Sequence, residues 1–485
     1  MRTTKKIIIA FLAVFMITAC DEDFLDLHPP YAISADEAFE TLDDFYSGLN
    51  GIYSALRGGG GYWGKNMMMN FAVATDEAYA VEGFTNQWGG FYNWAYTAGT
   101  SEIAGLWINA YRVSTRASNL IENHGDLTEG SRSERNQILG EAKLLRAMAH
   151  FDLVRVFAKP YKHSNPSSDL GVPIVTVENI EDKPRETIAD VYNFILEEAH
   201  EALDLLNTNR AIYYMGVDAA NAFLARVYQE MGDWENAAEY AGEAIGSRQL
   251  AEGQDYLNVW RRDGHGNGEV IFLCGVVQAE FTNGLNLGSN FVGSTPPAGG
   301  NWRIDYKPGV ELVELYDRDN DIRYEAFFED DVAIVGYEAG LTVLVKYYHD
   351  NPNFEQRGMN QMKVFRLSEM YLIKAEALAE LGEEADANQY LADLRDARIQ
   401  GYSHTDYSGD ELLEEIYKER QLELAFEGHR WFDLRRRGEG FERVPQVRST
   451  GRDDITIEPD NHRWIYPIPQ GEMDANRLMV QNPGY

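Results

Sequence analysis

The sequence predicts a mostly α-helical protein, in which a tetratricopeptide-like scaffold of helices carries an irregular, loop-rich face. Helical periodicity extends over most of the 485 residues, and residues 218–245 match the spacing of a tetratricopeptide helix hairpin. Two glycine-rich segments, 57–105 and 251–360, lack periodicity. We expect these two segments to form loops, short strands and single helical turns that cover one face of the scaffold.

The first twenty residues, MRTTKKIIIAFLAVFMITAC, have the pattern of a secretion signal. Basic residues precede an apolar run from Ile7 to Ile17, which is too short to cross a membrane because a spanning helix needs about twenty residues. The ITAC ending is similar to a bacterial lipobox, so we expect residues 1–19 to be removed and Cys20 to be lipidated. Residues 20–34 then form an acidic tether. The alternative is an ordinary signal peptide with a chance cysteine.

Helices are predicted in chain order from the apolar spacing and from the residues that flank it. Within 218–245, Gly232 marks the turn between two helices, and 370–398 is a weaker copy of the same hairpin. The run Arg435–Arg437 ends the last predicted helix, as the helix dipole favours, and is therefore no nucleic-acid patch. The other predicted helices are 35–56, 106–124, 135–157, 186–206 and 409–436. These patterns divide the folded chain into an N-terminal helical region, 35–250, and a C-terminal region, 251–485.

Charge and cysteine content exclude several classes of protein. The chain has 43 basic and 78 acidic residues, a net charge of −35, which repels phosphate backbones and favours a neutral ligand over a polyanion. We therefore expect no nucleic-acid partner. There are two cysteines, so lipidation of Cys20 leaves no intramolecular disulfide. Cys274, within the apolar run EVIFLCGVV, is predicted to be a small buried residue and no nucleophile.

No motif predicts catalysis, a metal site or a cofactor. Gly59, Gly61 and Gly64 match G-x-G-x-x-G, but they follow a helix instead of the strand that a dinucleotide site requires. The acidic turn at 317–321 has the aspartate spacing of an EF-hand, yet Ile322 stands where that loop needs glycine. HExxH, CxxC and G-x-S-x-G are absent from the sequence. We expect no enzyme, although chance calcium binding at the acidic turn stays open.

The stretch FTNQWGGFYNWAY, residues 84–96, contains six aromatic side chains in thirteen positions. Their spacing and the Gly89-Gly90 pair do not suit a buried helix, so we expect a loop. Two interpretations fit. The rings fix the loop to the helices, or they offer planes for the C–H face of a sugar while carboxamides meet its hydroxyls.

Further motifs are distributed along the whole chain: CDEDFLDLHPP (20–30), GEAKLLRAMAHFDLVRVFAKPY (140–161), GVPIVT (171–176), VFRLSEMYLIKAEALAELG (364–382), ERQLELAFEGHRWFDLRRRG (419–438) and IYPIPQGEMDANRLMVQNPGY (465–485). Together they resemble the SusD/RagB family of nutrient-binding lipoproteins of Bacteroidetes. Within the fifth motif we predict that Glu419, Glu423, Glu427 and Arg430 form a scaffold network and no ligand site. The acidic residues that follow Cys20 also resemble the surface-export signal of Bacteroidetes lipoproteins.

The resemblance implies a non-catalytic protein with a tetratricopeptide-like scaffold and an irregular ligand-binding face. It implies a lipid anchor in the outer membrane, exposure at the cell surface, and a SusC-like TonB-dependent transporter as partner. Such a protein captures oligosaccharides, here expected to be neutral, and delivers them to the transporter. Two alternatives stay open, a RagB-like peptide-binding lipoprotein and a transporter lid with little ligand affinity of its own.

The resemblance also changes the interpretation of the aromatic stretch. Family members bind ligands through variable loops, and one of these follows an early acidic pair, here Asp76-Glu77. This placement favours a ligand platform, and GGNWRIDY (299–306) is a second candidate loop. The expected ligand-binding residues are Asn86, Gln87, Trp88, Tyr92, Trp94, Trp302 and Arg303.

Overall fold

The computed structural model describes residues 38–176, 182–208, 210–263, 268–277, 288–291, 303–334, 340–348, 360–450 and 454–485. The predicted signal peptide, Cys20 and the tether lie outside these ranges. None of the described helices combines the length and the apolarity that crossing a membrane requires.

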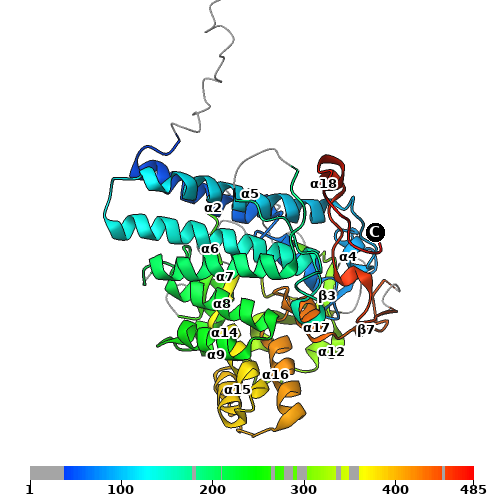
Figure 1. Ribbon diagram of the computed structural model, residues 1–485. Coiled ribbons are helices and arrows are strands. Elements are labelled where there is room, and N and C mark those ends of the chain that lie inside the picture. Colours follow the sequence, from blue (N-terminus) through cyan, green and yellow to red (C-terminus); the bar gives the residue numbers. More distant parts are fainter. Residues whose placement is uncertain are drawn as a thin grey trace, which may run out of the picture.

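The protein is a layered stack of helices, which confirms the predicted fold class (Figure 1). Successive members pack on one another: α2 (Leu42–Arg57), α5 (Ser101–Asn123), α6 (Arg132–Phe157), α7 (Ile188–Leu205), α8 (Val217–Met231), α9 (Trp234–Ile245), α14 (Leu367–Glu380), α15 (Glu384–Arg398) and α16 (Gly409–Glu423). The largest apolar core runs through the stack and contains residues from both halves of the chain.

The predicted tetratricopeptide hairpin is formed by α8 and α9. Gly232, with φ +73°, ends α8 in the left-handed conformation, and the carboxylate of Asp233 then caps α9. Buried alanines, including Ala237 and Ala241, let the two helices approach closely. The second predicted hairpin is α14 with α15, and α14 packs on α9. Two copies far apart in sequence are therefore neighbours in space.

The helix predicted at 35–56 begins later, at Leu42. Thr41 accepts a hydrogen bond from the Asp44 amide, and the Asp44 carboxylate accepts one from the Thr41 amide. This reciprocal cap fixes the start of α2. Ser131 and Glu134 form the same cap at the start of α6.

The helix predicted at 409–436 is wrong as a single element, because the chain forms two helices there. α16 ends at Glu423, and α17 (His429–Arg437) follows a break in which Phe426 and Gly428 have φ values of +62° and +85°. A Cβ on Gly428 would lie 2.6 Å from the carbonyl oxygen of Met67. The break therefore allows close contact with α3 (Asn66–Ala72). The arginine run does end a helix, as predicted.

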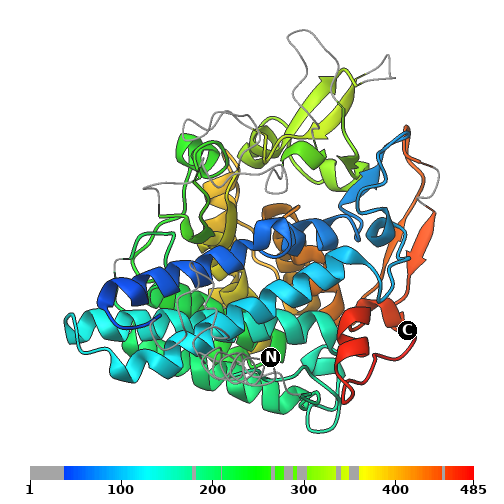
Figure 2. The same ribbon diagram turned by 90° about the horizontal axis from the view of Figure 1, so that it is seen from above.

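Small elements surround the stack, and most of them lie in the two aperiodic segments. Each of four antiparallel pairs joins segments that are distant or separated by a loop: β1 (Ala78–Ala80) with β3 (Tyr306–Pro308), β2 (Val270–Cys274) with β6 (Met362–Arg366), β4 (Phe328–Val332) with β5 (Leu341–Leu344), and β7 (Phe441–Arg443) with β8 (Ile455–Ile457). The short helices are α4 (Gly89–Tyr92), α10 (Gly253–Arg261), α11 (Gly288–Phe291), α12 (Val310–Val313), α13 (Ile322–Phe327) and α18 (Gln470–Ala475). Figure 2 shows β1, β7 and β8 together at one end of the long helices.

The three glutamates of the predicted network are buried and paired with basic residues, whereas Arg430 pairs with Asp76 instead. Glu423 binds Arg398 at 3.0 Å and Arg366 at 2.9 Å, and Glu427 binds Arg366 at 2.7 Å. Burial alone would raise the pKa of Glu423, but the guanidinium groups of Arg398 and Arg366 outweigh burial and hold it well below its usual range. Glu419 pairs with Arg395 in the same interior.

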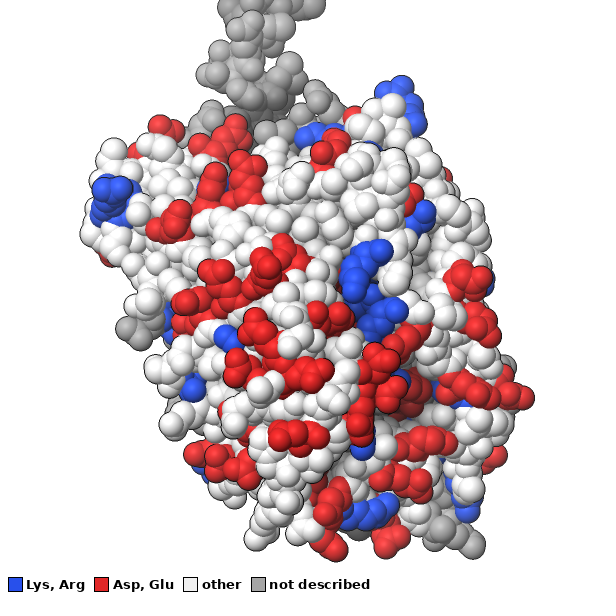
Figure 3. Space-filling model, turned by 60° about the horizontal axis from the view of Figure 1, so that its bottom comes forward, with Lys and Arg blue, Asp and Glu red and all other residues white. Residues whose placement is uncertain are grey.

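On the face drawn in Figure 3, acidic side chains outnumber basic ones, as the composition predicts. Acidic side chains gather on the face at the α15–α16 end of the stack, with fewer basic ones among them (Figure 3). A field of this sign repels anionic macromolecules.

We predict that Glu423→Gln lowers the free energy of unfolding at pH 7 by about 3–5 kcal/mol, because it removes a carboxylate that Arg398 and Arg366 share and leaves excess positive charge buried. Chemical denaturation measures this difference. Glu414→Gln, an exposed position on the same helix, is the control and should change it by less than about 0.5 kcal/mol.

A depressed carboxyl pKa stabilises the fold above the unfolded pKa, and this contribution is lost as the pH falls. The difference between wild type and Glu423→Gln should therefore shrink below about pH 4, near the ordinary glutamate pKa. Equal midpoints at pH 7 would refute the assigned role.

Candidate ligand-binding face

The two loops predicted to bind ligand are joined in the structure. Val81 donates its amide to the Asp305 carbonyl at 3.0 Å, next to the β1–β3 pair. The Asp305 carboxylate accepts the Thr85 amide at 2.7 Å and the Thr85 hydroxyl at 2.6 Å. The hydroxyl of Tyr306 donates to the Gln87 carbonyl. Residues 82–88 and 303–306 therefore form one surface, which we call the loop face.

The predicted polar residues of the loop face are accessible. The side chains of Asn86, Gln87 and Arg303 are exposed, and Trp88 is half-buried beside them. Trp302 lies outside the described residues.

The Trp88 ring is held in place by contacts on its buried side. Its indole N–H donates to Oδ1 of the fully buried Asn70 at 3.0 Å, and Nζ of Lys65 lies 4.9 Å from the ring centroid. Burial lowers the pKa of Lys65 to about 8. A ring held in this way keeps its orientation whether or not a ligand is present.

The backbone of this loop adopts the left-handed conformation at Asn86 and Trp88, and for Trp88 this conformation is strained. Asn86 has φ +66° and Trp88 has φ +54°, in the left-handed region that side chains other than asparagine rarely adopt. The Asn86 side chain folds over Gly89, where a Cβ would lie 2.2 Å from Asn86 Oδ1. Strain of this kind is characteristic of functional sites, where the surrounding structure imposes it.

Two predicted ligand residues, Tyr92 and Trp94, belong to the core instead. They are 0% and 4% exposed. The Trp94 indole donates to the Ala74 carbonyl at 2.7 Å and packs edge-on against Trp464, with ring centroids 4.8 Å apart. The guanidinium of Arg443 lies 4.0 Å from the Tyr92 ring centroid. The prediction for these two rings was wrong because partners more than 300 residues away bury them.

A shallow depression of about 470 Å³ adjoins the loop and is lined by Glu82, Gly83, Phe84, Asn86 and Thr450. Thr450 reaches it because its amide donates to the Ala80 carbonyl at 3.1 Å. Sequence analysis missed Glu82 and Thr450. No local pattern marks either residue, since pairing across the fold brings them together.

The acidic pair before the loop has a structural role. Asp76 binds Arg430 of α17 at 2.7 Å, and Glu77 accepts the Phe426 amide at 3.3 Å. Burial and the neighbouring Asp76 raise the pKa of Glu77 to about 8. These contacts attach the start of the loop to the C-terminal motif.

Metal chemistry finds no support in the described ranges, where no group of histidine, cysteine and acidic residues is arranged to hold an ion. The EF-hand-like spacing does not form an EF-hand loop. The Asp321 carboxylate instead binds the buried Arg323 at 2.8 Å and caps α13.

Comparisons with known proteins agree on one family. A family model described as "SusD family" matches residues 319–485, and one described as "Starch-binding associating with outer membrane" matches 23–229. SusD-like protein P2 of Formosa agariphila is 24% identical over 528 residues, covering 99% of this chain and 100% of that protein. SusD-like protein P38 of the same organism is 25% identical over 546 residues and covers both chains fully.

Solved structures show the same fold. A SusD superfamily protein from Bacteroides thetaiotaomicron has a TM-score of 0.80 at 27% identity, covering 91% of this chain and 100% of that one. A "Laminarin binding SusD-like protein" has a TM-score of 0.72 at 23% identity, covering 92% and 100%. The chain belongs to the SusD/RagB family.

We predict that Trp94→Ala lowers the free energy of unfolding by about 3–5 kcal/mol, because it empties a core site and leaves the Ala74 carbonyl unpaired. Arg303→Ala, at an exposed position of the same face, should leave stability within about 0.5 kcal/mol of wild type. Thermal and chemical denaturation of the two variants side by side measure this contrast. Equal stability of both variants would show that Trp94 is not a core residue.

Proposed function

We propose that the protein is a cell-surface lipoprotein that captures neutral oligosaccharides on the loop face and delivers them to a SusC-like TonB-dependent transporter. One observation carries the proposal. The strained segment at 86–88 holds an immobilised indole ring beside two exposed carboxamides.

This arrangement suits a sugar ring. The apolar C–H face of a sugar packs on an aromatic plane, and Asn86 and Gln87 each offer a donor and an acceptor to its hydroxyls. Arg303 adds further donors at the rim. An open site with few contacts gives micromolar to millimolar affinity, about −8 to −4 kcal/mol, which permits release to a transporter.

Charge supports a neutral ligand. The net charge of −35 opposes the approach of polyanionic glycans, and the acidic surface extends over a large face of the scaffold (Figure 3). The family match described as starch-binding and associated with the outer membrane supports both the ligand class and the location. Cys20 would supply the anchor, and the acidic tether would let the folded part reach a neighbouring transporter.

We predict that Gln87→Ala weakens binding of a neutral oligosaccharide about fivefold, because it removes hydrogen bonds worth about 1 kcal/mol. Calorimetry with a panel of neutral and acidic polysaccharides measures the change. Gln389→Ala, an exposed glutamine on α15, is the matched control and should bind as wild type does. We choose Gln87 because truncating Trp88 would also remove the partner of buried Asn70.

The same variants separate the alternatives. If extended peptides bind in place of glycans and depend on Gln87, the site is a peptide receptor. If no ligand binds and transport is unchanged in Gln87→Ala, the protein acts as a lid, and the proposed capture role is refuted.

We predict that Cys20→Ser moves the protein from the membrane fraction to the soluble fraction, because a serine cannot accept the lipid. Fractionation followed by immunoblotting measures the distribution. Cys274→Ser, at a residue buried in β2, should stay with the membrane. Retention of Cys20→Ser in the membrane would contradict a lipid anchor at this residue.

A further inference from the structure

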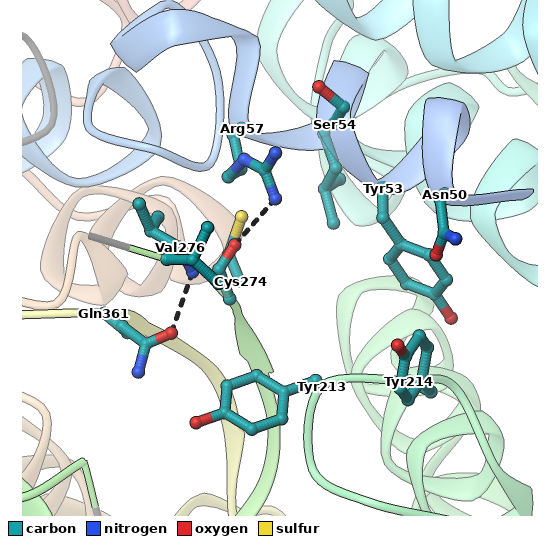
Figure 4. Close-up of a pocket in the computed structure, with 12 residues that line it drawn as sticks. Asn50, Tyr53, Ser54, Arg57, Tyr213, Tyr214, Cys274, Val276 and Gln361 are labelled. Carbon is teal, nitrogen blue, oxygen red and sulfur yellow. Dashed lines mark hydrogen bonds between the residues drawn. The ribbon is translucent and has the colours of Figure 1, made fainter. Parts of the chain in front are cut away.

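A second hollow, of about 430 Å³, shares no lining residue with the depression beside the loop face (Figure 4). Its volume is within the range of small-molecule sites. It is lined by Asn50, Tyr53, Ser54, Leu56, Arg57, Tyr213, Tyr214, Cys274, Gly275, Val276, Val277 and Gln361. We call it the tyrosine pocket. None of the predicted ligand residues that the structure describes lines it.

One wall is the chain that leaves β2, and it is held in place from two sides. Arg57 donates to the Gly275 carbonyl at 2.9 Å, and the Val276 amide donates to Oε1 of Gln361 at 2.8 Å. A Cβ on Gly275 would lie 2.6 Å from the Tyr213 ring, so glycine is needed for this ring to pack there.

The opposite side offers an immobilised aromatic ring. Tyr214 is 37% exposed, yet its ring meets Tyr53 edge-on at 5.5 Å, and the Arg210 guanidinium lies 4.9 Å from its centroid. Arg210 is itself held by Glu141 at 2.7 Å, and the Tyr53 hydroxyl donates to Glu141 at 2.5 Å. The ring is therefore both accessible and fixed.

Uncommitted polar groups lie beside this ring. Asn50 and Ser54 are one turn apart on α2, which faces Tyr213 and Tyr214 across the pocket (Figure 4). Within the described parts of the chain, the side-chain amide of Asn50 and the hydroxyls of Ser54 and Tyr214 have no hydrogen-bond partner. By contrast, the carboxamide of Gln361 is engaged by Val276 and by Asp263.

We propose that the tyrosine pocket is a second binding site, which takes one or two rings of a neutral saccharide. A sugar ring would lie on the accessible Tyr214 ring, and its hydroxyls would meet Asn50, Ser54 and the Tyr214 hydroxyl. Among the described residues that line the pocket none is acidic, and the one charged group among them, Arg57, binds the Gly275 carbonyl. A cationic ligand would find no counter-charge among these residues, and a neutral ligand needs none.

The inference goes beyond the proposed function and rests on it only for the class of ligand. Two separate weak sites on one protein would hold a long glycan more tightly than either site alone, because engagement of the second site becomes intramolecular.

Cys274 provides a test that reports on this pocket alone. In a Cys20→Ser chain it is the one remaining cysteine; it lines the pocket and is 3% exposed. Burial raises the pKa of its thiol to about 12, so a thiol-reactive probe should label it slowly at pH 8. We expect a saturating neutral mono- to trisaccharide to slow this labelling by at least about threefold, because it covers the pocket.

Matched variants show whether the protection of Cys274 arises from binding in the tyrosine pocket. Asn50→Ala should lower the affinity for the protecting saccharide about fivefold. Ser47→Ala, at an exposed residue of the same helix outside the pocket, should leave this affinity unchanged. Neither substitution empties a core site, so both variants should fold. Gln87→Ala on the loop face should leave the protection of Cys274 unchanged.

The outcomes distinguish the two proposals. If saccharides bind with dependence on Gln87 but none protects Cys274, the tyrosine pocket is refuted and the loop face stands. If protection depends on Asn50 but not on Gln87, the pocket is supported whatever happens at the loop face. If protection is the same in Asn50→Ala and wild type, the proposed contacts are wrong.

Discussion

Buried carboxylates that must not remain unpaired determine how the C-terminal half is assembled. Glu419, Glu423 and Glu427 follow at four-residue intervals, and all three are buried. An unpaired charge in such surroundings costs several kcal/mol, so arginines have to come from other elements. Arg366 comes from the end of β6 and Arg398 from the end of α15. Both elements are thereby fixed against α16.

The same principle extends to the loop face. α17 follows the network directly, and its Arg430 binds Asp76, two residues before β1. The aromatic loop begins after β1 and is therefore attached to the helical scaffold by an ion pair of limited exposure. We infer that the stiffness of Trp88 derives from the scaffold as much as from its immediate neighbours.

The sequence was sufficient for the scaffold because the relevant signals are local. Alanine spacing and Gly232 identify the hairpin at 218–245 without reference to the rest of the chain. The break after α16 was missed because the helical pattern continues across it. Only Gly428 hints at the break, which brings this position close to the distant Met67.

The candidate site could be predicted only in part for the same reason. Within one aromatic stretch, Trp88 is half-exposed and Trp94 is buried. Nothing in the local pattern separates them, since distant rings such as Trp464 and Phe441 cover Trp94. The tyrosine pocket was invisible from sequence because Asn50 and Tyr214 become neighbours only after folding.

The packing of the aromatic loop also sets an order of events. The residues that pack beneath this loop come from near the carboxyl end of the chain. Trp464 packs on Trp94, Tyr466 packs on Phe91, and Arg443 donates a hydrogen bond to the Tyr92 carbonyl. A polypeptide synthesised from its amino end thus contains residues 84–96 long before their packing partners near the carboxyl end exist. A chain truncated before Trp464 therefore cannot pack the aromatic loop as the complete protein does.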